Sequence, residues 1–195
     1  MQILNESASA YDHLSEALRK GGIICYPTET FYALGVDPWN DSACERLYSL
    51  KGRTYDKELP LIAASTQMVS QFCDTSDPRF TILAENFWPG PLTIVLPAAD
   101  RSGTYAIRVS SNHAARRISE SFGKPVISTS ANVSGKEPIR KPEELDTTII
   151  SGINLLLDGG ICPGGLPSTI VSLIKPVTEI LREGVVPSQK ILSLL

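Results

Sequence analysis

Three cations lie close together near the middle of the first half of the chain and could bind a phosphorylated ligand. Lys51, Arg53 and Lys57 fall within the segment KGRTYDK, after a predicted helix. Arginine binds phosphate oxygens in a planar bidentate manner and lysine supplies a compact point charge, so the segment suits a polyphosphate. The same cations could instead stabilise a helix C-terminus and face solvent.

Two segments rich in hydroxyl and amide groups follow predicted strands. The first contains Thr28, Thr30 and Tyr32, and the second, STSANVSG, contains Ser130 and Asn132. Ligands of open α/β sheets bind just beyond the carboxyl ends of strands, so both segments are candidate binding sites. Each could equally be a turn whose side chains hydrogen-bond their own backbone.

Polar groups also occur within or beside later strands. Arg108 lies inside the apolar strand pattern YAIRV, and a buried arginine needs a carboxylate, a phosphate or carbonyl oxygens as its partner. Ser168 and Arg182 lie at the ends of two further strands. Arg182 could contact a ligand or pair with a structural acid.

Other kinds of chemistry are not indicated. The sequence has no G-x-x-x-x-G-K-[ST] phosphate loop and no G-x-G-x-x-G after a strand. Cys25, Cys44, Cys73 and Cys162 form no C-x-x-C pair, and no histidine accompanies them at metal-ligand spacing. We therefore predict no protein-held metal and interpret the cysteines as buried free thiols.

The elements that must position these side chains are a mixture of helices and strands. Apolar periodicity predicts helices at 9–20, 41–50, 66–72, 78–87, 114–122 and 187–195. Short apolar runs predict strands at 23–26, 59–64, 92–96, 105–109, 125–129, 153–157, 168–173 and 177–181. The mixture predicts an α/β (α+β) fold, in which a single twisted mixed sheet is flanked by helices in one domain over 1–195.

Composition limits the class of protein. The chain has 195 residues, of which 42% are hydrophobic and 20% charged, and its net charge is −3. Dedicated duplex-binding proteins are usually basic, so any phosphate contact must come from a local cluster. No signal peptide precedes the first helix and no apolar run approaches ~20 residues, so we expect a cytoplasmic protein without membrane contact.

Taken together, the segments resemble the YrdC-like family, the L-threonylcarbamoyl-adenylate synthases, over nearly the whole chain. The family's motifs occur in order as PTETFYALG (27–35), KGR (51–53), WPGPLT (88–93), AIRV (106–109), SAN (130–132), STIV (168–171) and LREG (181–184). Any one of these motifs is weak, but their shared order is strong evidence. The resemblance implies a YrdC-like fold with a concave cationic face.

The resemblance also implies an enzyme, a nucleotidyltransferase whose substrates are L-threonine, bicarbonate and ATP. Threonine and bicarbonate would form a carbamate, which attacks the α-phosphate of ATP and releases pyrophosphate. Mg²⁺ would arrive with ATP. The threonylcarbamoyl-adenylate would pass to partner proteins that make N6-threonylcarbamoyladenosine in tRNA.

Roles for individual residues follow from the matching motifs. Lys51 and Arg53 would be catalytic. The ATP-binding residues would be Lys51, Arg53, Lys57, Thr104, Ser130, Asn132, Pro138 and Arg182. The threonine-binding residues would be Thr30, Tyr32, Arg108, Ser128 and Ser168. In the loop 134–142, Lys136, Arg140 and Lys141 would face the phosphates.

One departure and two alternatives accompany this interpretation. Many family members carry a histidine shortly after a P-L-I run, near the threonine, but PLIAA at 60–64 has none, which resembles the short, single-domain branch. A module that binds double-stranded RNA or tRNA without catalysis is one alternative, although the acidic balance argues against it. A carbamoyl-transfer domain of hydrogenase-maturation type is the other, but the zinc-type cysteine clusters of those larger proteins are missing.

Overall fold

The computed structural model describes residues 1–54 and 59–195. The helices are α1 (Ala8–Arg19), α2 (Asp41–Lys51), α3 (Thr66–Phe72), α4 (Pro78–Phe87), α5 (His113–Phe122), α6 (Thr147–Gly152) and α7 (Ser188–Leu192), with a 3-10 turn at Pro142–Glu144. The strands are β1 (Gln2–Asn5), β2 (Ile24–Tyr26), β3 (Ala33–Gly35), β4 (Leu61–Ala63), β5 (Leu92–Pro97), β6 (Thr104–Val109), β7 (Val126–Ile127), β8 (Thr129–Ser130), β9 (Leu155–Asp158), β10 (Thr169–Ser172) and β11 (Glu179–Arg182). Within this described part of the chain, no helix has both the length and the apolar character needed to cross a membrane.

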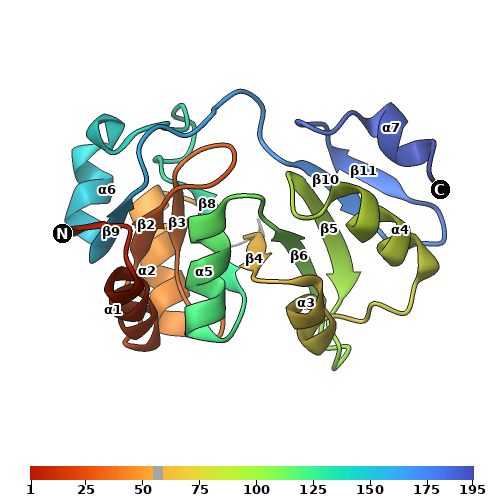
Figure 1. The fold of residues 1–195 in the computed structure, drawn as a ribbon, viewed down its shortest axis with the longest axis horizontal. Helices are drawn as coiled ribbons and strands as arrows, with labels where there is room; N and C mark the ends of the chain where they lie inside the picture. The colour runs from red at the N-terminus through yellow and green to blue at the C-terminus, as the bar shows by residue number, and fades with distance from the viewer. Residues whose placement is uncertain (55–58) are drawn as a thin grey trace.

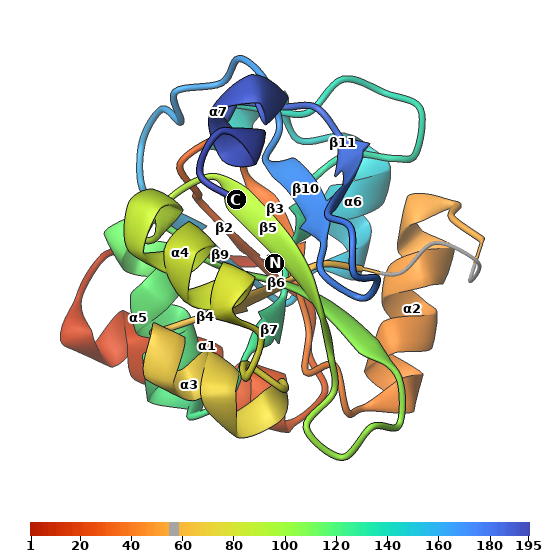
Figure 2. The ribbon, with the colours of Figure 1, turned by 90° about the vertical axis from the view of Figure 1, so that its right-hand side faces the viewer.

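The described strands form two mixed sheets, which lie side by side (Figure 1). The first sheet has the order β1-β9-β2-β3-β8 and the second the order β11-β10-β5-β6-β4-β7. Helices pack on the outside of both sheets, and α4 lies beside β5 in Figure 1 and Figure 2. The predicted α/β class is confirmed, although the strands divide into two sheets where the sequence predicted one.

The division between the sheets falls in the segment 125–129, which the sequence predicts as one strand. β7 pairs with β4 in the second sheet, whereas β8 pairs with β3 in the first. Between them, the N–H of Ser128 donates to the carbonyl of Pro60 at 2.7 Å, outside both ladders. The chain therefore passes from one sheet to the other at Ser128, and the hydroxyl cluster that follows lies where the sheets meet.

Three elements were not predicted from the sequence, and each depends on contacts with distant segments. β1 is mostly exposed and has no apolar alternation, but it pairs in parallel with β9. β3 lies within a motif that resembles a turn, yet it is buried between β2 and β8. The six-residue helix α6 is capped by Asp146, whose carboxylate accepts the N–H of Thr148.

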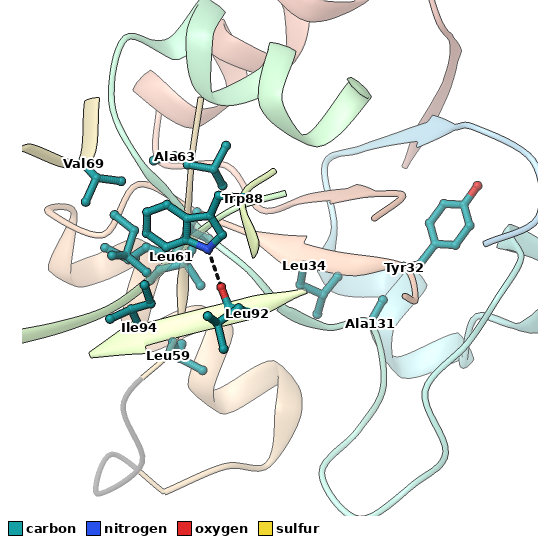
Figure 3. Packing of buried hydrophobic residues seen from close by; sticks show 14 of the residues in the cluster. Tyr32, Leu34, Leu59, Leu61, Ala63, Val69, Trp88, Leu92, Ile94 and Ala131 are labelled. Atoms are coloured by element: carbon teal, nitrogen blue, oxygen red, sulfur yellow. Dashed lines mark hydrogen bonds between the residues drawn. The ribbon is translucent and has the colours of Figure 1, made fainter. Parts of the chain in front are cut away.

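The motif around Trp88 joins two strands that carry site residues. Trp88 is buried in the core, and its indole N–H donates to the carbonyl of Leu92 at 2.6 Å (Figure 3). The N–H of Gly90 donates to the carbonyl of Val109, and the carbonyl of Pro91 accepts the N–H of Thr169. The turn thus holds the end of β6 beside the start of β10. Arg108, near the end of β6, and Ser168, just before β10, consequently lie at the same end of the strands of the second sheet.

Candidate active site

Lys51 is the last residue of α2, and its side chain is buried at 2% exposure. Its ammonium group donates to the backbone carbonyl of Asn132 at 2.7 Å and also to that of Ser130. Burial, followed by the nearby charge of Arg53, lowers the pKa of Lys51 from 10.5 to about 8. The buried ammonium therefore ties the end of α2 to the segment that follows β8.

The chain reverses direction immediately after Lys51. Gly52 has φ of +57°, a left-handed conformation that suits glycine, and the N–H of Arg53 donates to the carbonyl of Tyr48. The carbonyl of Lys51 accepts the N–H of Ser134 at 2.8 Å. This arrangement closes the helix and places Arg53 in the lining of one cavity with Ser130 and Ser134.

A first cavity, of about 320 Å³, opens at this junction. Its lining consists of Lys51, Gly52, Arg53, Thr54, Ser130, Asn132, Ser134 and Gly135. The amide nitrogen of Asn132 donates to the carbonyls of Val133 and Lys136, which orients the amide group. The amide oxygen of Asn132 is buried and has no hydrogen-bond partner among the described residues. Asn132 therefore lines the cavity with an amide group whose orientation is fixed by its own hydrogen bonds.

A second cavity, also of about 320 Å³, shares Arg53 and Ser130 with the first. Its lining consists of Thr28, Thr30, Phe31, Tyr32, Ala33, Arg53, Pro60, Arg108, Ser128, Thr129, Ser130, Pro138, Pro167, Ser168, Ile170 and Arg182. These residues come from both sheets and from the loops between them. The two cavities therefore adjoin along the line where the sheets meet.

Arg108 forms a buried ion pair with Glu29. Its Nε donates to Oε1 of Glu29 at 3.0 Å, and the two side chains are 6% and 9% exposed. The other carboxylate oxygen of Glu29 accepts from the hydroxyl of Ser110. A buried ion pair of this kind is stable only when hydrogen bonds satisfy both members, as they do for the carboxylate here.

Arg182 reaches the second cavity from β11. Its guanidinium donates to the carbonyl of Ser168 at 2.7 Å and to the hydroxyl of Ser168 at 3.1 Å. A Cβ at Gly184 would lie 2.2 Å from the carbonyl oxygen of Pro167, so only glycine allows the two segments to approach this closely. The L-R-x-G motif thereby positions Arg182 over Ser168.

Three guanidinium groups influence one another at the second cavity. Burial is the main cause that lowers the pKa of Arg182, and the charges of Arg108 and Arg53 lower it further. Like charges held together in a partly buried site repel each other, and an anion between them relieves the repulsion. The electrostatics of the second cavity therefore favour an anionic ligand.

The hydroxyl-bearing residues Thr28, Thr30 and Tyr32 also line the second cavity. The hydroxyl of Thr28 donates to the carbonyl of Phe31 and accepts the N–H of Thr30, so the turn is held by its own side chain. The hydroxyl of Tyr32 donates to the carbonyl of Gly160 at 2.8 Å and accepts the N–H of Gly159. The segment is therefore a turn that hydrogen-bonds its own backbone, and its side chains also line the second cavity.

The structure gathers most of the predicted site residues. Around the first two cavities it places Lys51, Arg53, Ser130, Asn132, Pro138, Arg182, Thr30, Tyr32, Arg108, Ser128 and Ser168. Thr104 lies instead in a third cavity, of about 220 Å³, with Pro38, Cys44, Tyr48, Leu59, Leu61, Tyr105, Ala106 and Ile127. Lys57 lies outside the described residues.

Two of the three cations of the loop 134–142 contact other groups of the protein. The ammonium of Lys136 pairs with the carboxylate of Asp146 at 2.6 Å. The Nε of Arg140 donates to the carbonyl of Cys162 at 3.0 Å. Lys136 and Arg140 thus link this loop to neighbouring segments of the protein.

Glu29 is the site residue that sequence reasoning missed. Two signals pointed to it: it lies between Thr28 and Thr30 in a predicted binding segment, and Arg108 needed a buried anion. As for metals, the described residues contain no group of three or more His, Cys, Asp or Glu side chains arranged to hold an ion.

Comparison with protein families and curated relatives gives consistent matches. The Sua5/YciO/YrdC family model, described as telomere recombination, matches residues 16–184. A threonylcarbamoyl-AMP synthase of Vibrio vulnificus (strain YJ016) is 36% identical over 179 residues, covering 87% of this chain and 95% of the relative. The threonylcarbamoyl-AMP synthase of Coxiella burnetii is 35% identical over 175 residues, covering 86% and 93%.

Solved structures share the fold. P. abyssi Sua5 complexed with L-threonine superposes with a TM-score of 0.91 at 27% identity, covering all of this chain. The present chain spans 60% of the length of that protein. E. coli YciO superposes with a TM-score of 0.83 at 26% identity, covering 94% of this chain and 95% of YciO.

Proposed function

This chain belongs to the Sua5/YciO/YrdC family, and on that premise we propose that it is a threonylcarbamoyl-AMP synthase. It would condense L-threonine, bicarbonate and ATP to threonylcarbamoyl-adenylate and pyrophosphate. The observation that carries the proposal is the pair of adjoining cavities that share Arg53 and Ser130. One cavity suits a polyphosphate and the other a small amino acid, so the shared wall is where the two substrates would meet.

The phosphates of ATP would occupy the first cavity. Lys51 and Arg53 supply positive charge there, and the hydroxyls of Ser130 and Ser134 can donate hydrogen bonds to phosphate oxygens. Asn132 lines the same cavity and would lie beside the nucleotide. Mg²⁺ would enter as part of the MgATP substrate.

The base of ATP would extend from the first cavity toward the third. Cys44, Tyr48 and Lys51 follow one face of α2, spaced by four and then three residues, so the third cavity and the first lie along the same side of this helix. The helix rises about 1.5 Å per residue, which separates Cys44 from Lys51 by roughly 10 Å. The largely apolar lining around Thr104 suits a flat base, consistent with Thr104 as a nucleotide contact.

Threonine would occupy the second cavity. Arg108 would bind its carboxylate, while Thr30, Ser128 and Ser168 would contact its other polar groups. Arg182, which is held by Ser168, would lie between the amino acid and the phosphates. Pro138 belongs to the loop that follows Asn132 and also lines the second cavity. It would lie along the nucleotide where the two cavities adjoin.

The chain's own residues would act by positioning and by charge. Threonine and bicarbonate form a carbamate with loss of water, and a carbamate oxygen then attacks the α-phosphorus as pyrophosphate leaves. Lys51 and Arg53 would offset the charge that develops on the phosphates, and the protein would supply no covalent nucleophile. Holding two substrates in reacting geometry can contribute ~7–11 kcal/mol to lowering the barrier.

Pyrophosphate release tests the proposal directly. Purified protein supplied with MgATP, bicarbonate and L-threonine should release pyrophosphate and form an adenylate that contains both threonine and bicarbonate carbon. Omission of threonine should abolish both products. Release that continues unchanged without threonine would contradict the assignment.

The alternative of an RNA-binding module receives less support from the geometry. RNA backbones contact exposed cations, whereas Lys51 and Arg108 are buried at the bottom of their cavities. We propose tRNA as the final destination of the threonylcarbamoyl group, through partner proteins that accept the adenylate. We propose the cytoplasm, where ATP and tRNA are both available, as the compartment of this activity.

A further inference from the structure

Glu29 lies behind Arg108 rather than in the wall of the second cavity. The described residues that line this cavity include Arg108 but neither Glu29 nor Ser110. Glu29 nevertheless has a side chain that is only 9% exposed. A buried carboxylate outside the ligand space but in contact with a lining residue can act on the ligand only through that residue.

The carboxylate of Glu29 is anchored at both oxygens. Oε1 accepts from the Nε of Arg108 at 3.0 Å, and Oε2 accepts from the hydroxyl of Ser110. Arg108 and Ser110 are two residues apart at the end of β6, so both face the same side of the sheet. The hydroxyl of Ser110 in turn accepts the N–H of Asn112, the cap residue of α5. The carboxylate therefore has one fixed position.

The turn that carries Glu29 is also fixed. The hydroxyl of Thr28 accepts the N–H groups of Thr30 and Phe31 and donates to the carbonyl of Phe31. These bonds hold the backbone on both sides of Glu29, and Ser110 holds its carboxylate, so Glu29 is restrained independently of Arg108.

Binding at Nε has a specific consequence for the guanidinium group. Arginine offers five N–H donors in a rigid plane, and Nε carries one of them. With Nε directed at Glu29, the two terminal nitrogens remain as a planar pair for a carboxylate on the cavity side. The charge of Glu29 also offsets the repulsion among Arg53, Arg108 and Arg182, which would otherwise drive Arg108 out of this position.

We infer that Glu29 is a positioning residue that holds Arg108 in the orientation required to recognise the α-carboxylate of an amino acid. The inference rests on the proposed function, because it takes threonine as the occupant of the second cavity. Glu29 thereby sets specificity for a free carboxylate over an amide of the same shape. It takes no part in proton transfer.

The test compares the binding of L-threonine with that of L-threoninamide, which lacks the carboxylate charge. Isothermal titration calorimetry would give both dissociation constants for the wild type and for Glu29→Gln. Glu29→Gln should raise the Kd of threonine roughly 10- to 100-fold, since small misplacements of a positioning group have effects of about that size. The Kd of threoninamide should change much less, so the preference for threonine should largely disappear.

A matched control and a milder variant accompany the test. Glu85→Gln removes the same charge from an exposed position on α4 and should leave both dissociation constants unchanged. Ser110→Ala keeps the charge of Glu29 but removes its second anchor, and should raise the Kd of threonine about threefold, with little change for threoninamide. This variant carries the test if Glu29→Gln does not fold.

Several outcomes would overturn the inference. Unchanged threonine preference in Glu29→Gln, or in Ser110→Ala where the first variant does not fold, would contradict it. Equal loss of threonine and threoninamide binding would indicate collapse of the cavity instead. A Glu29→Gln variant with normal threonine binding but a lost kcat would indicate a role in chemistry. Failure of the wild type to bind threonine would count against the proposed function itself.

Discussion

In the first cavity Lys51 is held by two backbone carbonyls, whereas in the second Arg108 is held by the carboxylate of Glu29. Carbonyls are neutral dipoles, so they fix the ammonium group without cancelling its charge. The carboxylate fixes the guanidinium and also offsets its charge. None of the described residues that line the first cavity is acidic.

The difference suggests a division of labour between the two cavities. An uncompensated buried cation lowers the energy of a highly charged ligand such as a polyphosphate. A compensated arginine adds little net charge but offers a rigid pair of donors that matches one carboxylate. Charge would therefore dominate the contribution of Lys51 to binding in the first cavity, and geometry would dominate that of Arg108 in the second.

Removal of the uncompensated cation should have the largest effect. Lys51→Met should lower kcat/KM for ATP by roughly 100- to 1,000-fold, the usual range for loss of one charge-stabilising donor. It should also lower the free energy of unfolding by about 1–3 kcal/mol, because the carbonyls of Ser130 and Asn132 lose their donor. Pyrophosphate release and urea denaturation measure the two effects.

Lys20→Met provides the control for Lys51→Met. Lys20 is exposed and pairs with Glu16 on the surface of the protein, so its loss should leave activity unchanged. Wild-type use of ATP by Lys51→Met would show that the buried ammonium serves only to hold the chain after β8.

Two arginine substitutions should separate the substrates. Arg53→Ala should raise the Kd of ATP by roughly 100-fold while the protein remains folded, because it removes a bidentate phosphate contact. Arg108→Met should raise the Kd of threonine more than that of ATP. Calorimetric titration with each substrate measures the Kd values of ATP and threonine in both variants. If Arg53→Ala affected threonine more than ATP, and Arg108→Met affected ATP more than threonine, the assignment of phosphate to the first cavity and carboxylate to the second would be refuted.

A third variant isolates geometry from charge at Arg108. Arg108→Met leaves the buried carboxylate of Glu29 without its cationic partner, so part of its effect comes from lost stability. Arg108→Lys keeps the positive charge but loses the planar pair of donors. Threonine binding should still weaken about tenfold in Arg108→Lys, and retention of full affinity would mean that charge alone is sufficient in the second cavity.

The pH dependence of ATP binding should reveal the unusual state of Lys51. Its pKa of about 8 leaves only roughly a tenth of the side chains protonated at pH 9, so ATP affinity should fall by up to about tenfold between pH 7 and 9. Calorimetry at several pH values measures this change. The same dependence should be absent from Lys51→Met, and its persistence there would assign the titration to another group.

Stability should respond to pH in the opposite direction. Between about 8 and 10.5 the unfolded chain keeps a proton on Lys51 that the folded chain has lost. The free energy of unfolding therefore gains a contribution from Lys51 as pH rises through this window, and the contribution is lost as pH falls through 8. At neutral pH the free energy of unfolding would therefore be lower than with a neutral Lys51, while the first cavity keeps its positive charge.

Local signals in the sequence mark many residues that the structure brings to the first two cavities, and the order of the family's motifs joined them into one predicted site. Cations after a helix, hydroxyls after strands and an arginine within an apolar strand can all be recognised without a structure. Most helices are found within one or two residues of their predicted bounds, since caps such as Asp77 and Gly123 are local as well.

What could not be predicted depends on contacts between distant segments. The pairing of Glu29 with Arg108 joins residues 79 positions apart, and the binding of Lys51 to the carbonyl of Asn132 joins residues 81 apart. The passage from one sheet to the other at Ser128 depends on which strands flank each half of that segment. No local pattern encodes such pairings.

Substitution of Tyr32 should have the smallest effect on threonine binding. It tests whether every hydroxyl that lines the second cavity contacts the substrate. The resemblance makes Tyr32 a threonine contact, but its hydroxyl already bonds the carbonyl of Gly160 and the N–H of Gly159. Tyr32→Phe should therefore raise the Kd of threonine less than about threefold and lower the free energy of unfolding by about 1 kcal/mol, the usual contribution of a hydrogen bond. Calorimetry and urea denaturation measure both. A large loss of threonine binding with unchanged stability would mean that the hydroxyl leaves the loop to bind the substrate, and that the second cavity rearranges when threonine enters.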